Sequence, residues 1–189
     1  MPARVARERY FSELDCLELS ALFAGPQKPN VLAKWKDVAP PKSIGLVAPF
    51  PITHRRAPAH PRPWPHDAST GDFRASPLAA QAVAALAAAV ADLDAGAIVF
   101  RSADDFSPSA ANREQLARFF GELAIDAERV WIPGGLWNAR TAAKLATELG
   151  VSLAIDPLVV DPSAPDERYE DLDVPGLYFR IESAGRVAP

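Results

Sequence analysis

The sequence predicts an α/β protein built on a parallel sheet, and three observations support this fold class. Short apolar segments typical of strands alternate with longer segments of helical periodicity along the 189-residue chain. Residues that favour helix starts precede most of the helical segments. The composition, 49% hydrophobic and 23% charged, is that of a globular protein. Because parallel strands need crossover connections, this order predicts helices packed outside a sheet in a single domain over residues 1–189, with a short C-terminal tail at 182–189.

The expected strands are short apolar runs bounded by turn residues. They comprise residues 17–23, 44–48, 97–100, 130–132, 153–155 and 177–181. In the first of them Glu18 and Ser20 are polar residues at alternate positions, and Gly25-Pro26 ends it. Chain order alone does not separate a barrel from a doubly wound sheet.

The expected helices follow recognisable start signals. An entry helix covers residues 4–14, and the later starts are Pro29, Ser76 with Pro77, Ser109 and Asn138. Gly96 and Gly150 follow two of these helices, as glycine does at many helix ends.

A long segment without regular structure is expected at residues 57–76, because its prolines remove backbone donors. His54, His60 and His66 lie in or beside this segment at even spacing. No known zinc-site pattern uses that spacing, so we predict no metal site, and the sequence identifies no cofactor.

Charge and composition restrict the partners and the compartment. A formal net charge of −4 argues against non-specific nucleic-acid binding, which depends on many cationic contacts to phosphates. The chain has no apolar run long enough to cross a bilayer and no secretory signal in residues 1–13. Cys16 is the only cysteine, in keeping with a reducing compartment. The sequence therefore predicts a cytoplasmic protein that is not integral to a membrane.

Three stretches carry a family resemblance. The first is residues 17–23 with Gly25-Pro26, Pro29 and Trp35; the second is Ala48-Pro49 with Ile52-Thr53-His54; the third holds Val130, Trp131, Pro133, Gly135, Trp137, Asp156-Pro157 and Tyr178-Phe179-Arg180. The first is similar to the E-L-N-x-T-F-Y strand and P-x-x-x-x-x-x-W helix of the YecE-like family, catalogued as domain of unknown function 72. The second is similar to the family's K-A-P-x-x-I-T-H, and the third to its V-x-W-E-P-R-G-x-W followed by V-D-P and Y-x-R-L-H-G. We identify the chain as a shortened and divergent member on this resemblance.

The resemblance implies an incomplete TIM-type β/α barrel. Family members begin with one strand before the first helix and end with a further helix and strand, whereas this sequence provides about six strands. The two strands it lacks, the first and the eighth, are neighbours in a closed barrel, so the gap is one opening with two exposed edges. Exposed edges favour pairing with another chain, and we therefore expect self-association as one mode of partner binding.

The departures from the family pattern bear on function. Ser20, Val47, Ile132 and Gly134 stand where the resemblance would place asparagine, lysine, glutamate and arginine. Several polar side chains that would line the family's pocket are thus replaced by apolar side chains or are missing. The first functional hypothesis is accordingly a non-catalytic or activity-reduced relative that binds a ligand or partner at the barrel mouth or the open edge.

The alternative hypothesis is a hydrolase acting on a phosphate ester or another anionic substrate. Functional residues of parallel β/α folds lie where strands end, which nominates His54 as general base and Asp156 as general acid, or both as ligands of a divalent metal. The candidate substrate-binding residues are Thr53, Arg101, Arg180 and Glu18. Glu18 lies early in its strand and is expected to face the barrel interior. A structural interpretation is favoured over this one: Asp156 and Arg180 form a buried ion pair that supports neighbouring strands, and His54 only begins a loop.

Overall fold

A computed structural model describes residues 7–134, 137–158 and 169–181 of the chain. In these ranges six strands form one sheet in sequential order, and every neighbouring pair is parallel. The strands are β1 (Leu17–Leu19), β2 (Ile44–Val47), β3 (Ala97–Arg101), β4 (Glu128–Ile132), β5 (Ser152–Ile155) and β6 (Leu177–Phe179). The predicted parallel α/β architecture is confirmed.

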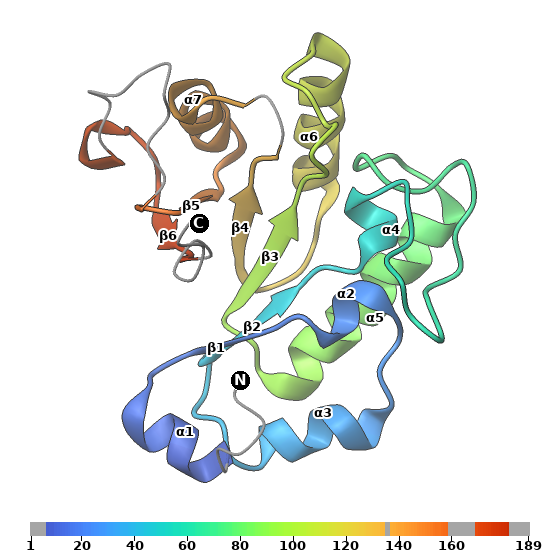
Figure 1. The fold of residues 1–189 in the computed structure, drawn as a ribbon, viewed down its shortest axis with the longest axis vertical. Helices are drawn as coiled ribbons and strands as arrows, with labels where there is room; N and C mark the ends of the chain where they lie inside the picture. The colour runs from blue at the N-terminus through green and yellow to red at the C-terminus, as the bar shows by residue number, and fades with distance from the viewer. Residues whose placement is uncertain (1–6, 135–136, 159–168, 182–189) are drawn as a thin grey trace, which may run out of the picture.

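The sheet is curled into a half-barrel, and the helices lie around its outside (Figure 1). A contact between the first and last strands demonstrates the curl, because Glu18 of β1 lies 3.0 Å from Arg180, the residue after β6. Six strands in a flat sheet would hold β1 and β6 about 24 Å apart at a spacing of about 4.8 Å. Within the described ranges β1 pairs only with β2, and β6 only with β5, so the barrel is incomplete.

Helices follow most of the strands and begin much as the sequence predicts. The helices are α1 (Arg7–Glu13), α2 (Ala21–Ala24), α3 (Pro29–Lys36), α4 (Phe50–Thr53), α5 (Pro77–Leu93), α6 (Ala110–Glu122) and α7 (Ala139–Leu149), with a 3-10 turn at Tyr169–Asp171. Ser76, Ser109 and Asn138 each cap a helix by accepting a backbone N–H with the side chain. None of the helices in the described ranges is both long and apolar enough to cross a membrane.

Two local expectations are wrong. The first strand ends at Leu19 rather than at residue 23, because Ser20 precedes the short helix α2 and Leu22 turns into the core. The second concerns the residues after β2, where no helix was expected. They form α4, a buried turn of helix that begins after Pro49. Residues 4–6 of the predicted entry helix and the expected C-terminal tail, 182–189, lie outside the described residues.

The outer face of the sheet packs against the helices and forms the larger core. Ile98 and Phe100 of β3 and Trp131 of β4 are all fully buried there. Phe100 meets Phe119 and Phe120 of α6 edge to face at 5.4 and 5.3 Å between ring centroids. Large apolar side chains thus fix the helices to the convex side of the half-barrel.

The inner face carries smaller side chains at alternate strand positions. Its buried members form a separate apolar cluster: Val47, Val99, Val130 and Ala154. Tyr178 and Ile132 are partly buried against them. Because side chains alternate between the two faces of a strand, these positions are the ones that would line a barrel interior. We call this set of four residues the inner layer.

Candidate functional site

One group of polar residues lies across the inside of the curled sheet. The Nε of Arg180 donates to both carboxylate oxygens of Glu18 at 3.1 Å, and its Nη2 donates to Oε1 at 3.0 Å. The hydroxyl of Tyr178 donates to Oε2 of Glu18 at 3.3 Å. The side chains of Glu18 and Arg180 are 19% and 26% exposed, so the ion pair is largely shielded from water. We call these three residues the cross-sheet cluster.

The cross-sheet cluster arises from strand alternation. Tyr178 and Arg180 project to the same side of β6, while Leu177 packs with the outer core. Gly45 of β2 has the Tyr178 hydroxyl as its nearest neighbour, 3.8 Å from where a Cβ would stand. Burial and the charge of Glu18 raise the pKa of Tyr178, so the phenol stays protonated and serves as a donor.

A second polar group lies after β2. Thr53, the fully buried last residue of α4, has its hydroxyl 2.7 Å from Nδ1 of His54. The imidazole of His54 also packs edge to face on Phe23, with 5.0 Å between ring centroids. Burial lowers the pKa of His54, and the nearby Arg101 guanidinium lowers it further, while Asp104, Asp105 and Asp72 act in the opposite direction. The ring is therefore held in its neutral form near pH 7.

The loop behind His54 is held by a buried carboxylate. Asp72, 2% exposed, pairs with Arg55 and lies 4.0 Å from Nε of Arg74. Gly71, Asp72 and Phe73 all have positive φ, at 83°, 54° and 57°. Their N–H groups donate to the carbonyls of Pro51, Thr53 and Ile52 in α4. Because two of the three are not glycine, this left-handed run is strained, and its backbone bonds with the buried aspartate hold it.

The structure places five of the six predicted site residues in these two groups, and Asp156 is in neither. Thr53, His54 and Arg101 belong to the second polar group, around the ends of β2 and β3, and Glu18 and Arg180 belong to the cross-sheet cluster. Within the described ranges the His54 side chain forms no hydrogen bond or ion pair with Asp156 or Arg180.

Glu18 faces the interior, as expected. The structural interpretation named Asp156 as the partner of Arg180, and the structure gives Arg180 a bidentate partner in Glu18. Asp156 itself accepts the Leu158 N–H at 3.0 Å, a local turn contact.

Two residues of these groups were not singled out from the sequence. Tyr178 could have been found from its position two residues before Arg180, because that spacing places both side chains on one face of a strand. Asp72 carried only a weak signal, the Gly71-Asp72 pair within a polar loop. Its burial depends on the packing of the loop against α4, which is a tertiary contact.

The strand ends beside these groups are closely packed. Trp131 donates from Nε1 to Oγ of the buried Ser102 at 2.8 Å. A Cβ on Gly134 would stand 2.5 Å from the carbonyl oxygen of Ala103, so only glycine lets the loops after β3 and β4 approach this closely. Among the described residues no cluster of three or more histidine, cysteine, aspartate or glutamate side chains could hold a metal ion.

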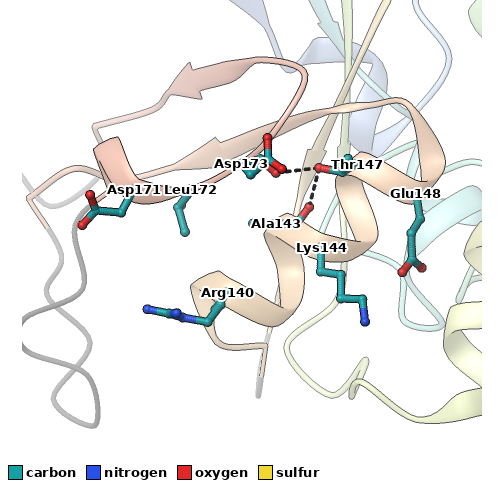
Figure 2. A pocket seen from close by; sticks show the side chains of 8 residues that line it. All are labelled: Arg140, Ala143, Lys144, Thr147, Glu148, Asp171, Leu172 and Asp173. Carbon is teal, nitrogen blue, oxygen red and sulfur yellow. Dashed lines mark hydrogen bonds between the residues drawn. The ribbon is translucent and has the colours of Figure 1, made fainter.

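A groove of about 400 Å³ lies elsewhere, between α7 and the chain at residues 171–173 (Figure 2). Thr147 closes one side by donating to the Asp173 carbonyl at 2.7 Å. Arg140 and Lys144 contribute positive charge, and Glu148, Asp171 and Asp173 contribute negative charge. This mixed lining favours neither an anionic nor a cationic ligand. None of the predicted site residues lines the groove.

Comparisons of the chain with protein-family models, with curated proteins and with solved structures found no match. The functional inference therefore rests on the two polar groups and on the inner layer, the four buried side chains on the concave face of the sheet.

Proposed function

We propose that this protein is a non-catalytic or activity-reduced relative of the YecE-like barrels that binds a small anionic ligand beside His54 and Arg101. The observation that carries the proposal is the inner layer. Val47, where the family resemblance would place a lysine, is a buried member of this apolar cluster, and Ile132 packs against it. Such a filled interior favours a core over a polar reaction chamber.

The cross-sheet cluster supports the same proposal. An anionic substrate held by Arg180 would have to replace Glu18, which already makes a bidentate contact with that guanidinium. Removing one member of a shielded ion pair leaves an uncompensated charge, which is costly. Arg101 is exposed and close enough to His54 to lower its pKa. The pair offers an exposed cation and a neutral hydrogen-bonding ring to an anion.

A thermal-shift screen of phosphorylated compounds, sugars and divalent metals tests the proposal, because a ligand that binds only the folded state raises its melting temperature. We expect a phosphorylated or carboxylated compound to stabilise the protein. Arg101→Gln is expected to reduce that shift, and Arg56→Gln, which removes an exposed arginine from the neighbouring loop, is the control. An equal shift in both variants would contradict the proposal.

The hydrolase alternative has one observation in its favour, the lowered pKa of His54, since a neutral imidazole can act as a general base near pH 7. Turnover of a phosphate ester, measured as released phosphate, tests it directly. An activity that disappears in His54→Gln, with unchanged melting temperature, would favour the enzyme over the binding protein.

Self-association at the open edge is the other form of the binding proposal. Phe179 of β6 and Ile181 beyond it are 51% and 57% exposed, so this edge offers apolar side chains to a partner as well as strand backbone. Light scattering over a range of protein concentrations tests this form. A monodisperse monomer throughout would exclude pairing of two copies at the edge.

A further inference from the structure

A groove between α5 and α6 lies on the outer helix layer. Its volume is about 330 Å³, within the range of small-molecule sites. Its lining comes from residues 73–76, from α5 and from the last part of α6 with Leu123. None of the predicted site residues belongs to this set, so the groove is separate from the proposed ligand position at His54 and Arg101.

The floor of the groove is apolar and firmly held. Phe73 and Leu123 are buried, and Phe73 packs edge to face against Phe119 at 5.3 Å between ring centroids. On the α5 side, Ala80 and Ala84 are exposed small residues whose side chains leave the space open. The groove thus combines a rigid aromatic end with an open helix wall, a shape suited to an apolar chain or ring.

Two arginines on the rim differ in how fully they are engaged. Arg74 donates to the carbonyls of Gly71 and Thr70 and lies near the buried Asp72. Arg118 has only a long contact, 3.5 Å from Nη2 to the Phe73 carbonyl oxygen. Among the described residues, Arg118 forms no ion pair. Arg118 is therefore a cation at the groove whose N–H groups can bind an external anion.

We propose that this groove binds a small amphiphilic monocarboxylate, with its carboxylate on Arg118 and its hydrocarbon tail on the apolar floor. A guanidinium binds carboxylates with paired hydrogen bonds, and the tail would gain from leaving water. Glu122, one turn after Arg118 on α6, also lines the groove. Its charge disfavours a second anionic group, which selects a monoanion over a dicarboxylate.

Decanoate is a suitable probe, and decanol is the matched compound without a charge. Isothermal titration calorimetry on the full chain, below the micellar concentration, is expected to give saturable decanoate binding. Arg118→Gln should weaken decanoate binding about tenfold, the usual scale of a hydrogen bond to a charged group, and leave decanol binding unchanged. Arg113→Gln, on the same helix but outside the groove lining, is the charge control.

A second pair of variants tests the location of the tail. Ala84→Phe fills the groove from an exposed position, and Ala88→Phe adds the same ring to an exposed position one turn further along α5, outside the groove lining. Only the first should abolish binding of decanoate. Equal affinity in these two variants, or the absence of saturable binding, would overturn the proposal. Arg101→Gln must leave decanoate binding intact, and a loss there would move the ligand to the other site.

Discussion

The two faces of the curled sheet are built from different side chains. On the outer face, β3 and β4 contribute Phe100 and Trp131, both fully buried against helices. On the inner face the same strands contribute Val99 and Val130, which pack with other small residues of the inner layer. The concave side of a curved sheet has less room per residue, so small β-branched side chains fill it without distorting the strands.

The difference shows that the two faces contribute to stability in different ways. The outer face supplies most of the buried apolar area and hence most of the stability. The inner face contributes less area, but it holds the cross-sheet cluster, whose Glu18–Arg180 contact joins strands at opposite edges of the sheet. Substitutions on the outer face should therefore lower overall stability, whereas those in the cluster should loosen β6 selectively.

The largest effect is expected for Trp131→Ala on the outer face. It removes a fully buried ring and leaves the Ser102 hydroxyl without its donor, and we expect a loss of about 3–5 kcal/mol in the free energy of unfolding. Val130→Ala, one residue earlier and on the inner face, should cost about 1–2.5 kcal/mol. Urea denaturation of both variants measures the difference, and equal losses would refute the proposed division between the faces.

A smaller effect is expected for Glu18→Ala, which leaves Arg180 without its bidentate partner. Because the pair is largely but not fully shielded, we expect a loss of about 1–3 kcal/mol. A double-mutant cycle with Arg180→Ala isolates the coupling between the two side chains. Arg9 and Glu13 in α1, 74% and 60% exposed, provide a matched pair whose coupling should stay below about 0.5 kcal/mol.

Hydrogen exchange can show where the Glu18→Ala effect is located. Loss of protection is expected first in β6, which has three residues and pairs only with β5 among the described strands. Protection in β3 and β4, which pair with neighbours on both sides, should persist. Uniform loss across all six strands would mean that the cluster supports the whole sheet rather than its edge.

Much of the fold was predictable because its determinants are local. Helix α5 begins at Pro77 after the capping residue Ser76, and α7 begins after the capping residue Asn138 and ends at Leu149. In both, the backbone geometry and the capping bonds come from neighbouring residues. The short helix α2 was missed because its apolar residues also suit a strand, and only the burial of Leu22 decides between the two.

The candidate site was predictable only in part. The rule that functional residues lie at strand ends nominated Thr53, His54 and Arg101, and the structure places Thr53 and Arg101 close to His54. The partner of Arg180 is 162 positions away in the chain, and the match to Glu18 depends on how far the sheet curls. No local pattern encodes that curvature, since it results from the packing of the helices outside and the small residues inside.

Tyr178→Phe tests the hydroxyl contribution to the cross-sheet cluster. Loss of its donor to Glu18 should cost about 0.5–1.5 kcal/mol at pH 7. The pKa of Tyr178 is raised in the folded state, so the wild type should lose stability as the pH rises above about 10, where the unfolded tyrosine ionises first. Stability of the variant, followed by urea denaturation from pH 8 upward, should fall less steeply than that of the wild type.

The smallest effect is expected at His54. Its pKa is lowered by burial and by Arg101, so the unfolded chain takes up a proton at this position before the folded protein does. Stability from this group is therefore complete above the ordinary histidine pKa of about 6.5 and declines as the pH falls below it. His54→Gln should flatten the stability profile between pH 7 and 5, whereas His60→Gln, in the proline-rich loop, serves as the control. Matching acid profiles in wild type and His54→Gln would mean that His54 is not held neutral, which would also remove the observation that favours a hydrolase.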